Sequence, residues 1–176
     1  MSLSVNFYKM HYYRNVIIIF IIYMTSNKVI IQNIINTKIP ITSRELKKIV
    51  DQVLQFSKIK YELVIRLVDI EEIIMLNKHY RKKNQPTNVI SFQFEIPQGV
   101  KSNYLGDIVI CIPIVIKEAK IQHKNIKKHL CHLLIHGVLH LLGYNHENTE
   151  KAKVMEKKER EYLKNLNFKK IILNNK

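Results

Sequence analysis

The run HGVLHLLGYNH, at residues 136–146, constrains the fold of this chain more than any other segment. His136 and His140 are four residues apart, so on an α-helix their imidazoles lie one turn apart on the same face. Gly143 favours the end of that helix, because glycine adopts a positive φ without strain. His146 then follows the turn. The run predicts a helix in the C-terminal half of the chain and a loop that folds back over it.

Three imidazoles placed in this way predict a metal site with one coordination position left open, which is typical of catalytic zinc. His129 and His132 lie on nearly the same helical stripe and are rival ligands. A packed, uncoordinated side chain is the alternative for any single histidine. Only the pair His136 and His140 is followed at the right distance by a glycine and a third histidine. We therefore predict that His136, His140 and His146 bind one Zn²⁺ per chain.

The same spacing occurs in a superfamily of zinc metalloproteases, in which a glutamate follows the first histidine and acts as the general base. Gly137 occupies that position here, and glycine cannot accept a proton. A peptidase of that type is therefore disfavoured. Glycine inside a helix costs about 1 kcal/mol relative to alanine, so we expect a bulky ligand or another backbone to approach closely at Gly137.

Composition places the chain among globular proteins with an anionic partner. Its 176 residues suit one domain, and 29 Lys and Arg against 14 Asp and Glu give a formal net charge of +15. Such an excess favours nucleic acid or an anionic membrane as a partner. Compositional drift in an AT-rich genome, indicated by the many Ile, Lys and Asn residues, is the alternative explanation.

Two further features indicate a cytoplasmic protein without a membrane segment. Cys111 and Cys131 lie in apolar runs without a metal-binding spacing, which predicts buried thiols in a reducing compartment. The apolar run at residues 16–24 is far shorter than the roughly 20 residues of a membrane helix. We interpret residues 1–24 as an overhang or a disordered tail, with a targeting segment as the alternative.

Hydrophobic periodicity predicts an α+β domain at residues 25–167. Strands are expected at 28–33, 61–68, 88–95 and 107–112, and the fully apolar last strand is expected to be central. Two helices are expected to begin after capping residues: Thr42, with Glu45 three residues later, and Asp69, with Glu72 three residues later. Three more helices are expected at 113–122, 126–142 and 149–165. Pro97, Gly99 and Gly106 predict a loop. The elements form about four strands of a mixed sheet packed against helices, followed by a frayed basic tail at 168–176.

Three ordered blocks of sequence resemble the YbeY-type metal-dependent endoribonucleases of bacteria, over about residues 28–166. The first block holds Leu76-Asn77, Tyr80-Arg81 and PTNVISF at 86–92. The second is LGDIVIC at 105–111, followed by Glu118-Ala119. The third runs from His132 through the histidine run to Met155-Glu156 and Glu159.

This resemblance implies a cytoplasmic, zinc-dependent endoribonuclease that is specific for single strands. Its expected partners are ribosomal RNA and ribosomal particles, in 3′-end maturation of the small-subunit RNA and in ribosome quality control. His136, His140 and His146 match the metal ligands of the family, and Arg81 matches its active-site arginine. Asn145 stands where the family usually has an aspartate, so a role of that carboxylate does not transfer directly to this chain.

Arg81 also suits the reaction on physical grounds, because a guanidinium can hold two oxygens of a phosphate as negative charge develops. A solvated loop charge beside Lys82 and Lys83 is the alternative, and those two lysines are expected to contact the RNA backbone. Thr87, Asn88 and Ser91 are candidates to line the cleft, and Asp107 is a candidate to brace it. Each of these four residues also has an ordinary structural explanation.

Three classes of function stay open at this level. The leading hypothesis is a metal-dependent endoribonuclease. A metal hydrolase of another substrate, such as a peptidase, and a non-catalytic ribosome assembly factor with a structural metal are the alternatives. Residue types and spacing do not choose between water and the RNA 2′-hydroxyl as the nucleophile. Glu147 is the carboxylate nearest to the histidine run, but no carboxylate in the run is an evident general base.

Overall fold

The computed structural model describes residues 26–35 and 39–166, and it has the predicted α+β fold with one four-stranded mixed sheet. The predicted tails at 1–24 and 168–176 lie outside the described residues. The strands are β1 (Lys28–Asn33), β2 (Glu62–Val68), β3 (Val89–Gln93) and β4 (Tyr104–Cys111). The helices are α2 (Ser43–Leu54), α3 (Ile70–Arg81), α4 (Ile112–Ile121), α5 (Ile126–Leu141) and α6 (Thr149–Asn165).

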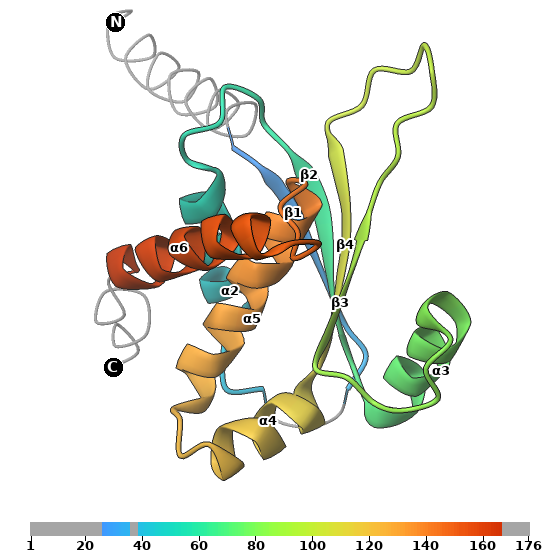
Figure 1. Ribbon diagram of the computed structural model, residues 1–176, viewed down its shortest axis with the longest axis vertical. Helices are drawn as coiled ribbons and strands as arrows, with labels where there is room; N and C mark the ends of the chain where they lie inside the picture. The colour runs from blue at the N-terminus through green and yellow to red at the C-terminus, as the bar shows by residue number, and fades with distance from the viewer. Residues whose placement is uncertain (1–25, 36–38, 167–176) are drawn as a thin grey trace, which may run out of the picture.

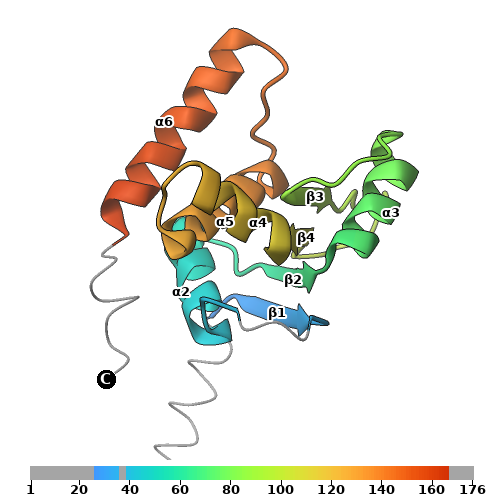
Figure 2. The same cartoon turned by 90° about the horizontal axis from the view of Figure 1, so that it is seen from below.

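The sheet has the strand order β1-β2-β4-β3, with β1, β2 and β4 parallel and β3 antiparallel to β4. The predicted central position of β4 is confirmed. Helix α3 lies on one face of the sheet, and α2, α5 and α6 lie on the other (Figures 1 and 2). Strand β4 is apolar over its C-terminal half because it is buried on both faces: Ile108 and Ile110 join the main core, whereas Val109 and Cys111 join a smaller core under α3.

Local hydrogen bonds explain where the first two described helices begin. The Thr42 hydroxyl accepts from the Glu45 backbone N–H at 3.2 Å, and the Glu45 carboxylate accepts from the Thr42 N–H at 2.6 Å. This reciprocal pair is the predicted capping box. Asp69 likewise accepts from the N–H of Glu72 at 2.9 Å.

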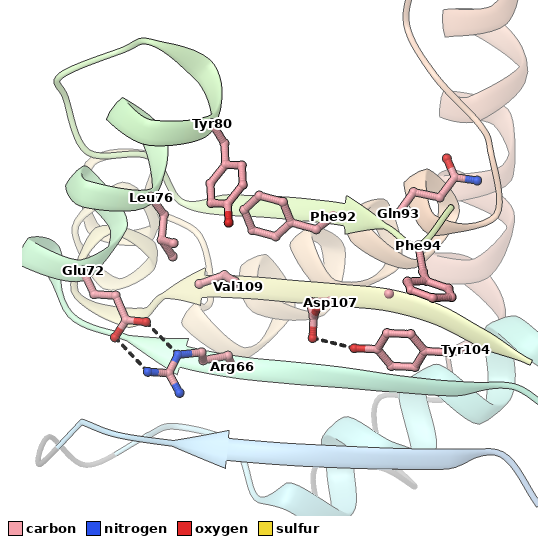
Figure 3. Close-up of a pocket in the computed structure, with 11 residues that line it drawn as sticks. Arg66, Glu72, Leu76, Tyr80, Phe92, Gln93, Phe94, Tyr104, Asp107 and Val109 are labelled. Carbon is pink, nitrogen blue, oxygen red and sulfur yellow. Dashed lines mark hydrogen bonds and ion pairs between the residues drawn. The ribbon is translucent and has the colours of Figure 1, made fainter. Parts of the chain in front are cut away.

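Helix α3 is attached to the sheet by an ion pair as well as by apolar contacts. Arg66 on β2 donates to both carboxylate oxygens of Glu72 on α3, at 2.6 and 3.2 Å (Figure 3). This two-pronged geometry fixes the side chain of Arg66 against the start of the helix.

Gly106 was expected in a loop, and this prediction was wrong because β4 already begins at Tyr104. The pairing with β2 shifts between Tyr104 and Gly106, so the strand is irregular at this point. Gly106 has φ +130°, and a Cβ there would overlap the backbone carbonyl of Phe92 on β3. Glycine therefore marks a close approach of two strands, which in sequence is indistinguishable from a loop signal.

The two cysteines are buried, as predicted, in the part of the chain that the structure describes. Burial raises the pKa of the Cys131 thiol to about 12. Little thiolate therefore forms at neutral pH, and Cys131 acts as a small apolar side chain in the core.

Between residues 26 and 166, leaving out 36–38, we find no helix whose length and apolar character would let it cross a lipid bilayer.

We expect Gly106→Ala to lower the free energy of unfolding by more than about 3 kcal/mol, because the methyl group meets the Phe92 carbonyl in a backbone region that disfavours side chains. Gly99→Ala is the matched control: its φ is also positive at +82°, but nothing lies within 4 Å of the added Cβ. We expect the control to cost about 1–2 kcal/mol. Urea unfolding measures both, and equal losses would contradict the close approach of the two strands.

Candidate metal centre

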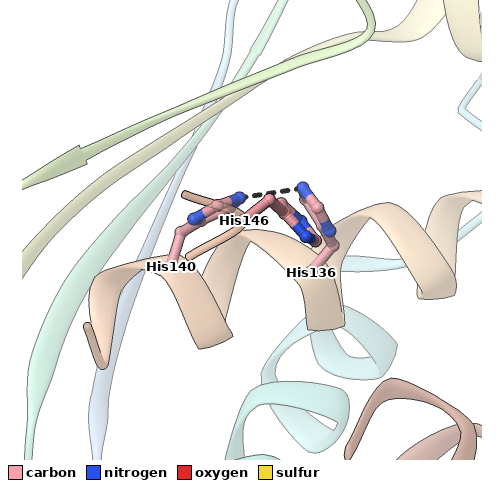
Figure 4. Close-up of side chains that lie close together, drawn as sticks. All are labelled: His136, His140 and His146. Carbon is pink, nitrogen blue, oxygen red and sulfur yellow. Dashed lines mark hydrogen bonds between the residues drawn. The ribbon is translucent and has the colours of Figure 1, made fainter. Parts of the chain in front are cut away.

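Helix α5 and the loop after it bring His136, His140 and His146 together (Figure 4). One ring nitrogen of each lies within 4.8 Å of those of the other two. The Nε2 atoms of His136 and His140 are 3.0 Å apart. Zinc–nitrogen bonds of about 2.0–2.1 Å place two ligand nitrogens roughly 3–3.4 Å apart, so the spacing of the first pair already suits a shared cation.

The position of His146 depends on how α5 ends. Gly143 has φ +90°, as its place in the sequence predicted. The N–H groups of Gly143 and Tyr144 donate to the carbonyls of His140 and Leu139 at 2.9 and 3.0 Å, which closes the last turn of the helix. The chain then returns toward α5, and the ring of His146 stacks against that of His136 with centroids 5.2 Å apart.

Asn145 stabilises the loop that carries His146. Its side-chain oxygen accepts from the backbone N–H of Glu147 at 3.3 Å, across the residue that carries the imidazole. An amide makes this bond as well as a carboxylate does, so the neutral residue keeps this part of the loop intact.

Gly137 lets α5 approach the sheet. A Cβ at this position would lie 3.0 Å from Ile108 Cγ2 and 3.1 Å from Ser91 Oγ. The close approach expected from the sequence is therefore present, but its partners are side chains of β4 and β3 rather than a ligand or another backbone. The contact places His136 and His140 beside the edge of the sheet.

Glu159 on α6 is the residue whose role sequence reasoning missed. Its side chain is 10 % exposed, and its carboxylate lies 2.7 Å from Nδ1 of His136 and 2.9 Å from Nε2 of His132. Burial alone would raise its pKa, but the hydrogen bonds from the two histidines lower it to about 2. An ionised Glu159 accepts a hydrogen bond from the Nδ1–H group of His136, which leaves Nε2 of that ring with a lone pair toward the other two histidines.

The surroundings of His140 also favour the uncharged form of its ring, which is the form that binds a metal. His140 makes a hydrogen bond with the backbone of Tyr144. Burial lowers the pKa of its ring, and the neighbouring His136 and His146 lower the pKa further. A neutral ring keeps the lone pair that a metal requires.

The rival histidines are held in other interactions. His129 Nε2 lies 2.8 Å from the carboxylate of Glu118, which also accepts from Asn88 at 3.0 Å. His132 faces Glu159. Neither histidine belongs to the three-imidazole group. Asn88 points into the Glu118 cluster rather than into the cleft.

Arg81 lies in a pocket beside the histidines, which we call the histidine pocket. This pocket has a volume of about 280 Å³. It is lined by Arg81, Ser91, Gln93, His140, Gly143, Tyr144, Asn145 and Glu147. Ser91 and Arg81 are thus brought to His140 from elements distant in sequence. Glu147 reaches the pocket as an exposed carboxylate that pairs with Lys151 at 2.6 Å.

The end of α3 determines where Arg81 lies. Lys82 adopts φ +59° and ends the helix directly after Arg81. The side-chain amide of buried Asn77 donates to the backbone carbonyl of Gln85 at 2.7 Å. The backbone carbonyl of Asn77 accepts from the backbone N–H of Lys83 at 3.3 Å. These two bonds hold the loop that leads from Arg81 to β3.

Thr87 and Asp107 do not line the histidine pocket. Asp107 lies on the opposite face of the sheet, where it accepts from the Tyr104 hydroxyl at 2.8 Å. Asp107 therefore does not brace the histidine pocket, because alternation along β4 separates it from Ile108, which faces α5.

The donor set fits a zinc ion with an open position. Three imidazole nitrogens are ligands that Zn²⁺ accepts, and two of the rings have a hydrogen-bonding partner that orients them. Within residues 26–35 and 39–166, no fourth His, Cys, Asp or Glu joins the group. A cation held there would thus be reachable from the histidine pocket.

We expect Glu159→Gln to weaken zinc binding about 10- to 100-fold, because an amide is a poorer acceptor for the Nδ1 proton of His136. Glu156→Gln, on the exposed side of α6, is the matched control and should bind zinc like the unchanged protein. Competition with a chromophoric chelator measures the affinity. Equal affinities for both variants would contradict an orienting role of Glu159.

The matches to known proteins cover largely the same part of the chain that the structure describes. The family model described as "Endoribonuclease YbeY" matches residues 31–167. A protein named Endoribonuclease YbeY from Vesicomyosocius okutanii is 46 % identical over 136 residues, which cover 77 % of this chain and 93 % of that protein. Another of that name from Alteromonas mediterranea is 41 % identical over 136 residues, with 77 % and 85 % covered.

The fold is similar to that of a solved protein as well. The solution structure of TM1509 from Thermotoga maritima superimposes with a TM-score of 0.56 at 27 % sequence identity. The match covers 77 % of this chain and 87 % of that one.

Proposed function

The chain belongs to the endoribonuclease YbeY family, and we propose that it is a metal-dependent endoribonuclease that cleaves single-stranded ribosomal RNA. We further propose Zn²⁺ as the metal, His136, His140 and His146 as its ligands, and Arg81 as a catalytic residue. Ribosomal particles in the cytoplasm are the proposed setting of the reaction. The convergence of three imidazoles beside a pocket that contains Arg81 is the observation that supports this function best.

The charge of the chain supports an RNA substrate. The net charge of +15 attracts a polyanion. Arg81 lines the histidine pocket, and Lys82 and Lys83 follow it directly in the chain. All three side chains are exposed, so they can exchange water for phosphate oxygens. Binding by these residues should weaken as the salt concentration rises.

In the proposed reaction, the guanidinium of Arg81 holds non-bridging oxygens of the scissile phosphate and stabilises negative charge as it develops. When bound, zinc supplies Lewis-acid chemistry at the same phosphate. Glu159 keeps the Nδ1 proton on His136, and the Tyr144 backbone orients His140, so neither ring has to reorganise during the reaction. Glu147 is the one acidic side chain that lines the pocket and is therefore the carboxylate placed to accept a proton.

Both alternative functions have less support. A metalloprotease of the related spacing needs a carboxylate at position 137, and this space is filled by Ile108 and Ser91 of the sheet. A structural metal is normally closed by a fourth protein ligand. The three-histidine group has none within the described part of the chain.

Removal of the metal should abolish RNA cleavage. We expect purified protein treated with a strong chelator to leave single-stranded ribosomal RNA intact, and stoichiometric Zn²⁺ to restore cleavage, as followed on denaturing gels. Cleavage that continues unchanged without metal would overturn the proposal. The ends of the products identify the nucleophile: a 2′,3′-cyclic phosphate indicates the 2′-hydroxyl, whereas a linear phosphate is consistent with water.

We expect Arg81→Ala to lower kcat for RNA cleavage about 100- to 1000-fold, because one charged contact to the transition state is lost. Zinc affinity should stay the same, since Arg81 is not in the three-histidine group. Arg44→Ala on the exposed surface of α2 removes the same charge away from the pocket and serves as the control. Equal activity of both variants would show that Arg81 contributes only general charge.

A further inference from the structure

A second cavity lies on the face of the sheet opposite α5, and we call it the aromatic groove (Figure 3). It has a volume of about 390 Å³, within the range of roughly 300–1,000 Å³ that is usual for small-ligand sites. Its lining includes Tyr80, Phe92, Gln93, Phe94, Tyr104 and Asp107.

Four aromatic rings give the groove its character. Tyr80 and Phe92 form one edge-to-face pair with centroids 4.7 Å apart, and Phe94 and Tyr104 form another at 5.3 Å. Tyr80 is 59 % exposed and Phe94 is 40 % exposed. Rings in edge-to-face contact leave a π-face for a further ring, and a cluster of exposed aromatic side chains indicates a binding surface.

The charged groups in the groove favour a neutral ligand over a phosphate. Arg66 is already paired with Glu72, and Asp107 adds a second carboxylate to the lining. Tyr104 donates to one oxygen of Asp107, which leaves the other oxygen able to accept a hydrogen bond. Carboxylates accept from exocyclic amino groups such as N4 of cytosine. The groove therefore combines surfaces for stacking with an acceptor for an amino group.

The groove and the histidine pocket meet at the edge strand β3. Gln93 lines both cavities. Tyr80 of the groove directly precedes Arg81 of the pocket, and Phe92 lies between Ser91 and Gln93 on β3. Strand β3 is an edge strand of the sheet. An RNA strand that crosses this edge can thus place a phosphate at Arg81 and a neighbouring base in the groove.

We propose that the aromatic groove binds one unpaired, amino-bearing nucleobase, adenine or cytosine, next to the scissile phosphate of the RNA substrate. This inference rests on the proposed function and extends it to substrate recognition. Base stacking on aromatic side chains does not read sequence strongly, and Asp107 supplies the preference for an amino group. A base-paired strand cannot present a base in this way, which gives a physical reason for a preference for single strands.

The test uses the full chain with zinc and short single-stranded RNA oligonucleotides. We expect Phe94→Leu, which removes the ring but keeps an apolar side chain, to raise KM roughly 5- to 150-fold, the loss expected for one base stack. The value of kcat should stay nearly unchanged. Phe94→Tyr keeps the ring and should restore tight binding. Phe56→Leu, at a ring that is 83 % exposed and away from the groove, is the matched control.

Two further measurements identify the base. With 2-aminopurine placed at successive positions of the oligonucleotide, binding should quench the fluorescence at one position beside the cut, and Phe94→Leu should remove this quenching. Asp107→Asn should reduce the preference for cytosine over uracil at that same position, because an amide can also donate to the O4 of uracil.

The outcomes separate this inference from the proposed function. If the unchanged protein neither binds nor cleaves RNA, the proposed function fails and the groove inference fails with it. If the protein cleaves RNA but the groove variants match Phe56→Leu in KM and quenching, only the groove inference is overturned. Such a result would indicate that the aromatic groove contacts a protein partner or another segment of this chain instead of RNA.

Discussion

The contact between α5 and the sheet at Gly137 is the constraint on which the proposed site depends. Because position 137 has no side chain, the helix lies against Ile108 and Ser91. This brings the imidazoles of His136 and His140 to the edge strand, where Arg81 arrives from the end of α3. A larger residue at 137 would push the helix outward and separate the two halves of the pocket. Glycine therefore acts here through packing, at the position where proteases of similar spacing use a carboxylate.

A second constraint comes from the orientation of the rings. Three histidines close in space do not make a metal site unless each presents a lone pair to the same point. Glu159 accepts a hydrogen bond from Nδ1 of His136, and the Tyr144 backbone is a hydrogen-bonding partner of His140. The carboxylate belongs to α6, which follows the histidine loop in sequence and crosses back over α5 (Figure 1). The geometry of the site thus depends on the packing of two helices as well as on the spacing of one run.

Much of this arrangement could be predicted from the sequence, because the signals were local. The turn at Gly143, the capping box at Thr42 and the apolar strand ending at Cys111 each depend on residues close together in the chain. The role of Glu159 could not be predicted, since one glutamate among several on a charged helix carries no periodic signal. The prediction that Gly106 lies in a loop was wrong for a related reason, because its close neighbour Phe92 lies on another strand. Likewise, the position of Asp107 on the sheet face opposite the histidine pocket can be assigned only when the pairing of β4 is known.

The attachment of α6 has a consequence for the cooperativity of the fold. Within its bounds this helix buries only Met155 and Glu159, whereas α5 is buried along most of its length. Elements with few buried apolar contacts detach at lower free energy than the rest of a protein. When α6 undocks, the sheet and α5 can persist while His136 loses its acceptor and its fixed tautomer. A helix with few buried residues thereby controls the tautomer of a proposed metal ligand. A cation bound by that ligand would in turn stabilise the docked position of α6.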